Sequence, residues 1–126
     1  MRIILAIILF AHGIAHLPGF IVSFQLTALE EIPYKTTILA GNVDLGDVGI
    51  KVMGALWLTA ALAFSVSGIS TIARVQSWKT VTLLTSVFSL FLCITGRPDA
   101  RFGLFINLAL IAFLLANRRI NWLKKI

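Results

Sequence analysis

Charged side chains are scarce in this chain of 126 residues, and acidic ones are the scarcest, with five Asp and Glu against eleven Lys and Arg. Only 13% of the residues are charged, whereas 59% are hydrophobic. A soluble chain of this length would have more apolar surface than its core could bury, so the sequence predicts a protein of the lipid bilayer. No linker, charge block or low-complexity run divides it, and residues 1–126 are expected to form a single transmembrane domain.

The groups on which most enzyme motifs depend are also few. The single cysteine, Cys93, excludes a disulfide or dithiol chemistry within the chain. There is no phosphate-binding loop, no nucleophile elbow and no pair of carboxylates at catalytic spacing. The net charge of +6 does not indicate nucleic acid, because the basic residues flank apolar runs instead of forming a stripe with accessible aromatics. We expect lipid as a partner and no nucleic acid.

Four apolar runs cover about residues 3–26, 48–69, 79–96 and 102–117. As helices rising ~1.5 Å per residue they can cross ~30 Å of hydrocarbon, although the last two are near the lower limit. The first run resembles a signal peptide at its start, but its apolar character continues through Leu26, so we expect a true span. The predicted fold class is therefore all-α, an integral membrane four-helix bundle.

The distribution of Lys and Arg predicts the orientation of this bundle. Arg2, the turn with Arg74 and Lys79, and the C-terminal tail share one side, which the positive-inside rule makes cytoplasmic. Both termini are then cytoplasmic in a multi-pass protein of the cell (inner or plasma) membrane. Trp78 and Trp122 are expected in an aromatic belt on the cytoplasmic side.

The segment between the first two runs is too polar to span and forms a long extracytoplasmic loop in this arrangement. Residues 36–41 (TTILAG) are β-prone, and residues 41–47 (GNVDLGD) have the composition of a turn. We expect this loop to fold over the mouth of the bundle as a short hairpin or interfacial cap.

Small and weakly polar residues mark the faces through which helices associate in a bilayer. The third run carries such residues at steps of three and four, namely Thr82, Ser86, Ser89, Cys93 and Gly96. This stripe is expected to face protein.

Two histidines, His12 and His16, lie four residues apart in the first run and therefore share one helix face. Counting ~1.5 Å per residue along each span puts both near the middle of the bilayer. A polar group at this depth is costly unless it is paired or hydrated. Both imidazoles are expected to point inward, toward Asn107, Ser89 or Trp57, or toward a water-filled cavity.

Pro18 and Gly19 follow His16 directly and predict a kink in the first span, which would leave the carbonyl of Ile14 free. Charged residues at the outer mouth would complete a cup with apolar walls and an imidazole floor. The candidate ligand-binding residues are His12, His16, Trp57, Asn107, Lys51, Asp99 and Arg101.

The histidines allow several roles. As neutral imidazoles they would join helices by hydrogen bonds. The His-x-x-x-His spacing would also bring two ring nitrogens of His12 and His16 to one metal ion, although a third ligand is missing from the local sequence. Either histidine is a candidate catalytic acid or base for a lipid-like substrate. No cofactor is required by the sequence, and a quinone or a metal would fit the cup.

Three segments, FAHGIAHLPGF, KVMGALWLTAALAF and PDARFGLFINLAL, together resemble a family of small bacterial four-span membrane proteins described as DoxX-like, or loosely as transporter permeases. The resemblance covers most of the chain and is weakest over residues 27–46. It implies a four-helix architecture but no single activity. The matching positions are His12, Gly13, His16, Gly19, Lys51, Gly54, Trp57, Asp99, Gly103 and Asn107.

Three functions stay open at this stage. The preferred one is a DoxX-like protein with a polar intramembrane pocket for a small or lipid-soluble, quinone-like ligand. The second is an accessory subunit of a larger membrane complex, in which the histidines join helices or contact a cofactor of a partner; the partner expected besides lipid is a second copy of the chain or another membrane subunit. The third is a membrane-embedded enzyme that uses a histidine as acid or base.

Overall fold

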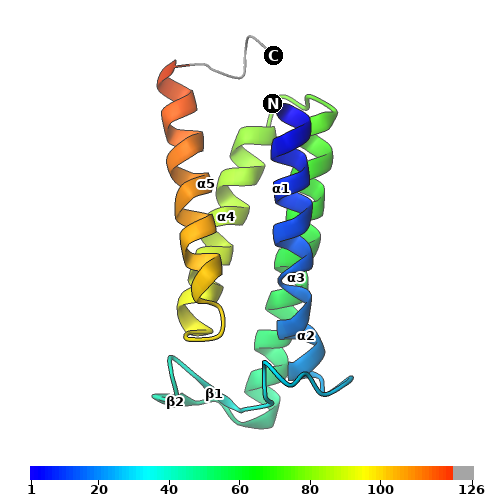
Figure 1. The fold of residues 1–126 in the computed structure, drawn as a ribbon, viewed down its shortest axis with the longest axis vertical. Helices are drawn as coiled ribbons and strands as arrows, with labels where there is room; N and C mark the ends of the chain where they lie inside the picture. The colour runs from blue at the N-terminus through cyan, green and yellow to red at the C-terminus, as the bar shows by residue number, and fades with distance from the viewer. Residues whose placement is uncertain (121–126) are drawn as a thin grey trace.

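The computed structural model describes the backbone of residues 1–120 and the side chains of residues 1–118 (Figure 1). Its elements in chain order are α1 (Arg2–Ile14), α2 (Leu17–Ser23), β1 (Thr37–Ile38), β2 (Val43–Asp44), α3 (Gly46–Ile72), α4 (Trp78–Thr95) and α5 (Arg101–Ile120). Four helical units are long and apolar enough to cross a membrane: α1 together with α2, then α3, α4 and the described part of α5. They agree with the four predicted runs to within a few residues, which confirms the four-helix prediction.

The first of these units is interrupted between α1 and α2. The backbone N–H of His16 bonds to the carbonyl of Gly13, at 3.1 Å, and not to that of His12. Pro18 lies in the first turn of α2, where its fixed φ suits the helix and its missing N–H costs nothing. The predicted kink is therefore a turn that interrupts the α-helix, while Ala15 and His16 keep right-handed helical dihedrals. The sequence had drawn attention to the carbonyl of Ile14, which Pro18 cannot bond. In the structure the side chain of His16 bonds to a different carbonyl, that of His12.

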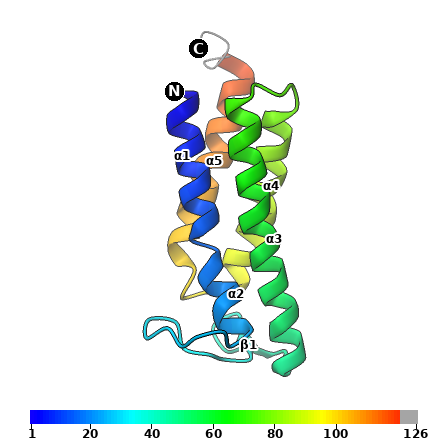
Figure 2. The ribbon, with the colours of Figure 1, turned by 90° about the vertical axis from the view of Figure 1, so that its right-hand side faces the viewer.

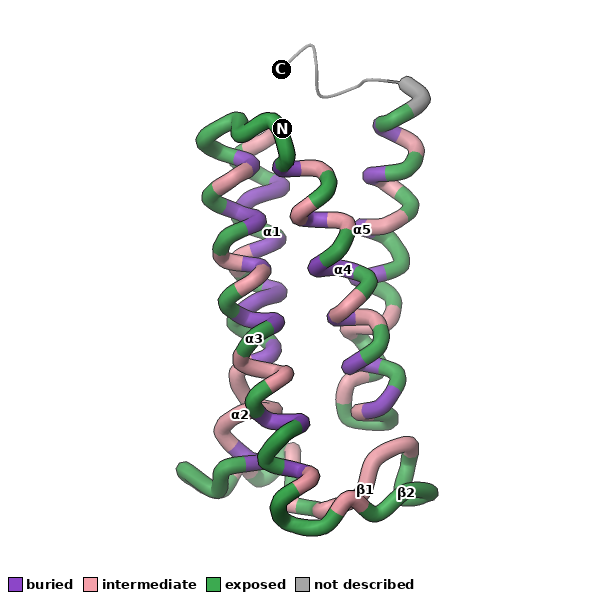
Figure 3. Tube along the Cα trace, turned by 180° about the vertical axis from the view of Figure 1, so that it is seen from behind, coloured by how far each residue is buried: buried purple, intermediate pink, exposed green. Residues whose placement is uncertain are grey.

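The helix α3 is central: it packs against α1 and α2 and against α4, while α5 packs along α4 (Figures 1 and 2). Buried residues lie on the faces that the helices turn toward one another, and many exposed residues on the outer faces are large and apolar (Figure 3). An apolar groove separates α1 from α5 near the N-terminus. It is lined by Met1, Ile4, Leu5, Ile8, Ile106, Ala109, Leu110 and Phe113. The seam between α1 and α5 is thus open at the surface, whereas behind it Leu5, Leu9, Leu110 and Leu114 belong to one buried cluster.

Small residues set the distance between the packed helices. A Cβ at Gly13 would lie 3.0 Å from the carbonyl oxygen of Ala61 and 3.0 Å from the Cβ of Phe64, both on α3. A Cβ at Gly68 would lie 2.9 Å from the ring of Phe10. The stripe predicted on α4 also faces protein: Thr82, Ser86, Ser89 and Cys93 are buried, and Gly96 is half-buried. Close backbone approach therefore holds these helices together.

The loop between α2 and α3 forms the predicted hairpin. Its strands β1 and β2 pair antiparallel, with Thr37 opposite Asp44. The N–H of Leu39 donates to the carbonyl of Thr95 at 2.8 Å, and the N–H of the next residue donates to the carbonyl of Arg97 at 3.2 Å. These bonds join the hairpin to the end of α4, so the loop lies across one end of the helices (Figure 2).

Charge is distributed unequally between the two ends of the molecule. The end with the hairpin and the α4–α5 turn carries all five acidic residues of the sequence, Glu30, Glu31, Asp44, Asp47 and Asp99, together with several basic ones. The opposite end, with the N-terminus and the α3–α4 turn, carries Arg2, Arg74, Lys79 and Arg118 (Figure 1). Trp78 lies there too, with the guanidinium of Arg2 at 5.2 Å from its ring centre. Trp122, expected beside it, lies outside the described residues.

Candidate functional site

The imidazole of His16 completes the hydrogen bonding of the helix break. His16 is 2% exposed, and its Nδ1 lies 2.7 Å from the carbonyl oxygen of His12, which the break deprives of its helical N–H partner. Because a carbonyl oxygen can only accept, Nδ1 donates, and the neutral imidazole then presents Nε2 as an acceptor. The tautomer of His16 is therefore fixed by the backbone.

Ser89 and Asn107 continue the chain of hydrogen bonds across α4 and α5. The hydroxyl of Ser89 donates to Nε2 of His16 over 2.6 Å. The Nδ2 group of Asn107 donates to this hydroxyl at 2.8 Å and lies 3.6 Å from Sγ of Cys93. The Oδ1 atom of Asn107 lies 3.1 Å from Nε2 of His12 and accepts its proton. Both ends of the Asn107 amide are thereby used.

These bonds form a closed loop of His12, Asn107, Ser89 and His16, which we call the polar circuit. The loop runs from the side chain of His12 through the other three side chains and returns to the backbone carbonyl of His12. Every donor points the same way around it. All four side chains are buried, and one ring nitrogen, Nδ1 of His12, has no hydrogen-bond partner among the residues that the structure describes. A buried network of this kind fixes the relative positions of the helices that supply it.

The inward orientation predicted for the histidines is confirmed, together with three of the expected partners. His12 bonds to Asn107, and His16 bonds to Ser89. The rings of His16 and Trp57 are 5.3 Å apart between centroids. Phe64 completes the surroundings, with its ring 4.7 Å from that of His12.

Trp57 separates the polar circuit from a pocket at the hairpin end of the molecule. Its indole packs directly on two glycines: a Cβ at Gly19 would lie 2.6 Å from Cγ of the indole, and a Cβ at Gly96 would lie 2.9 Å from Cζ2. On another side it contacts the ring of His16. The indole thus fills space that side chains at these two glycines would need.

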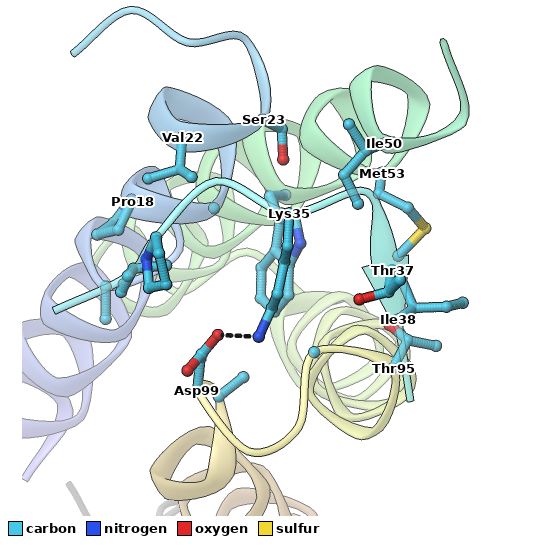
Figure 4. Close-up of a pocket in the computed structure, with 17 residues that line it drawn as sticks. Pro18, Val22, Ser23, Lys35, Thr37, Ile38, Ile50, Met53, Thr95 and Asp99 are labelled. Atoms are coloured by element: carbon cyan, nitrogen blue, oxygen red, sulfur yellow. Dashed lines mark hydrogen bonds and ion pairs between the residues drawn. The ribbon is translucent and has the colours of Figure 1, made fainter. Parts of the chain in front are cut away.

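The pocket has a cavity volume of about 140 Å³ and lies between α2, α3, the loop and the α4–α5 turn (Figure 4). Its apolar lining includes Pro18, Val22, Ile38, Ile50, Met53 and Trp57. Lys35 extends from the loop toward Asp99, and the two form an ion pair with 2.6 Å between Nζ and Oδ2 (Figure 4). Both charged side chains are partly exposed, so they stand at the mouth of the pocket.

The predicted cup differs from this arrangement at its floor. The indole of Trp57 closes the pocket from below, so His12, His16 and Asn107 lie one layer deeper and do not line it. Among the predicted rim residues, Asp99 lines the pocket. Lys51 and Arg101 are exposed outside it, the latter with its guanidinium 5.1 Å from the ring centre of Phe102.

Two side chains of the loop have shifted pKa values. The backbone N–H of Gly46 and the hydroxyl of Thr36 donate to Asp44 at 2.9 and 2.8 Å and lower the pKa of its carboxyl. The hydroxyl of Tyr34 donates to Asp47 in the first turn of α3, and this bond raises the pKa of Tyr34. Both interactions fasten the loop to the beginning of α3.

Sequence reasoning missed Lys35 and Phe64 as parts of this region. Lys35 is 64 residues from Asp99, and only the folded loop brings them together. The signal that was available is weak: two segments expected on the same side of a membrane carry opposite charges. Phe64 had no signal, because nothing distinguishes it from the other aromatic residues of an apolar span.

The side chains around the histidines do not have the composition of a metal centre. Within the part of the chain that the structure describes, no three His, Cys, Asp or Glu residues are grouped so as to hold an ion. Both nitrogens of His16 and one of His12 are already in hydrogen bonds. These donors and acceptors join helices.

No family model, curated protein or solved structure matches the chain. The DoxX-like resemblance therefore stays a prediction. The fold and the site define the class only: a helical protein with four helices able to cross a membrane, a buried polar circuit and a pocket at one end.

Proposed function

We propose that the chain is a multi-pass membrane protein that binds a small, lipid-soluble molecule, with a quinone-like head group as the model ligand. The supporting observation is the pocket of about 140 Å³, with apolar walls and one ion pair at its mouth. A dry apolar cavity of ~150 Å³ in another protein binds benzene. The pocket of this chain is open at its mouth and partly polar in its lining, and its volume suits one ring with small substituents.

Lys35 supplies the polar contact in this proposal. Its ammonium group has three N–H donors, and among the described residues Asp99 is the hydrogen-bond partner found for it. The remaining donors are suited to a carbonyl or hydroxyl oxygen on the ligand. Small-molecule sites usually combine apolar walls with a few polar groups that orient the ligand.

The proposal places the hairpin end outside a bacterial inner membrane and both termini in the cytoplasm. Support comes from the N-terminal end, where Arg2, Arg74, Lys79 and Arg118 have no acidic residue among them. Membership of the DoxX-like family belongs to the same proposal. The polar circuit then has a supporting role, because it holds His16 beneath the indole that closes the pocket.

A membrane-embedded enzyme with a histidine base has less support. Nε2 of His16 bonds to Ser89, and neither histidine lines the pocket. Proton transfer to a ligand would first require Trp57 to move.

The test compares two lysine variants of the full chain. Lys35→Met should reduce the amount of lipid-soluble molecule that copurifies from membranes in mild detergent, because it removes the donor at the pocket mouth. Mass spectrometry of an organic extract measures this amount per mole of protein. Lys51→Met is the matched control, since Lys51 is an exposed lysine outside the pocket. Equal loss in both variants, or no bound molecule in the unmodified protein, contradicts the proposal.

The open seam supports a second candidate function, that of an accessory subunit. The α1–α5 groove is lined by eight residues, all of them apolar, and no helix of this chain covers it within the described residues. A transmembrane helix of another subunit would bury this surface.

A further inference from the structure

The floor of the pocket is held in place from three directions. Gly19 of α2 and Gly96 at the end of α4 contact the indole of Trp57 so closely that a Cβ on either would come within 3 Å of it. His16 lies against the indole at 5.3 Å between centroids. His16 is itself fixed by hydrogen bonds to the His12 carbonyl and to Ser89. The indole therefore cannot retreat without displacing backbone or breaking the polar circuit.

The depth of the pocket follows from this fixed indole. A cavity of about 140 Å³ accommodates one six-membered ring, as the benzene-binding cavity of ~150 Å³ does. Because the proposal places the polar group of the ligand at Lys35, at the open mouth, a second fused ring would extend inward, where the indole already lies. Forcing extra atoms into packed protein typically costs ~1–3 kcal/mol, which is roughly tenfold or more in affinity.

We infer that Trp57 limits the pocket to ligands whose polar group is carried on a single six-membered ring, and that Gly19 and Gly96 position its indole for this purpose. The inference rests on the proposed function and names the class of ligand. It makes Trp57 the specificity-determining residue of the site. Replacing the indole by a smaller ring brings the ligand closer to His16, so the discrimination between one ring and two should weaken.

The experiment uses acetophenone and 2-acetonaphthone, which carry the same acetyl group on one ring and on two fused rings. Binding to the full chain in detergent is measured by saturation-transfer NMR with competition titration. The unmodified protein should bind acetophenone roughly tenfold or more tightly than 2-acetonaphthone. Trp57→Phe should reduce this ratio severalfold, mainly by improving 2-acetonaphthone binding. Trp78→Phe, the same change at the opposite end of the molecule, should leave the ratio unchanged.

A second variant tests the positioning glycines. Gly96→Ala inserts a methyl group against Cζ2 of the indole and should push the ring into the pocket, which weakens the binding of both ketones. If Trp57→Phe does not fold, as judged by circular dichroism, the binding of the two ketones to Gly96→Ala still tests the inference. Equal affinity for the two ketones in the unmodified protein overturns the inference and leaves the proposed function standing. An unchanged ratio in a folded Trp57→Phe does the same, and so does unchanged ketone binding in Gly96→Ala. Absence of binding by either ketone to every protein overturns both.

Discussion

The most constrained residues of the molecule are the four of the polar circuit. Each hydrogen-bonding step depends on the one before it, because the His12 carbonyl fixes the tautomer of His16 and His16 fixes the direction of the Ser89 hydroxyl. In an apolar environment the alternative to these bonds is an unsatisfied polar group, which is costly. The circuit should therefore contribute to stability as a unit.

We expect Ser89→Ala and Asn107→Leu to destabilise the protein by about 0.6–2 kcal/mol each. Because both changes break the same circuit, the double variant should cost less than the sum of the two, with a coupling of at least about 0.5 kcal/mol and no more than the smaller single cost. Unfolding in mixed detergent micelles, followed by circular dichroism, measures these free energies. The control pairs Asn107→Leu with Thr59→Ala, since the exposed hydroxyl of Thr59 bonds only within its own helix. Additive costs in the first pair would show that the circuit is not cooperative.

The sequence was sufficient to place these residues near one another but not to order their bonds. Depth along each span brought His12, His16, Ser89 and Asn107 to one level, since helical rise is regular. Which residue donates to which depends on the turn before Pro18, and this turn redirects a single backbone N–H. The position of the Trp57 indole was equally out of reach, because it depends on contacts with two glycines from different helices.

At the scale of elements, the hairpin is the part that responds most directly to pH. Asp44 accepts from Gly46 and Thr36, and its pKa is lowered in the folded protein. A lowered pKa means that the stabilisation is complete above the usual pKa of an aspartate and is lost as the pH falls through the folded value.

The strands were predictable from composition, whereas the attachment of the hairpin to α4 was not, since backbone bonds carry no sequence signal.

We expect acidification below about pH 4 to loosen the hairpin. Hydrogen exchange at the N–H of Gly46, corrected for the intrinsic rate at each pH, should lose protection as Asp44 becomes protonated. In Asp44→Asn this pH-dependent loss should be absent, because the amide does not titrate in this range. Asp47→Asn serves as the comparison and should retain it. Persistence of the full acid response in Asp44→Asn would assign it to another group.

At the scale of the whole molecule, the seam between α1 and α5 is the feature that the sequence did not predict. Periodicity identifies which face of a helix is apolar but not whether a partner from the same chain covers it. The four-helix prediction did not say which helices pair, and in the structure α5 packs along α4 and leaves an apolar groove beside α1.

If a helix of another subunit covers this groove, Ala109→Trp should release the partner by filling the groove. Ala112→Trp is the matched control, since Ala112 is exposed on α5 outside the groove. Size-exclusion chromatography with light scattering in mild detergent measures the mass of the complex. If the unmodified protein, Ala109→Trp and Ala112→Trp are all monomers, the support for the accessory role is removed.

The unequal charge of the two ends has an electrical consequence in the proposed orientation. A membrane potential that is negative inside acts on each charge that crosses it with ~2.3 kcal/mol per 100 mV. Inverting the molecule would carry Arg2, Arg74, Lys79 and Arg118 outward, against the potential. The hairpin end would move inward at little electrical cost, because its five acidic residues are nearly balanced by Lys35, Lys51, Arg97 and Arg101. An energised membrane would therefore hold the protein in one orientation, and the restraint would strengthen as the potential rises.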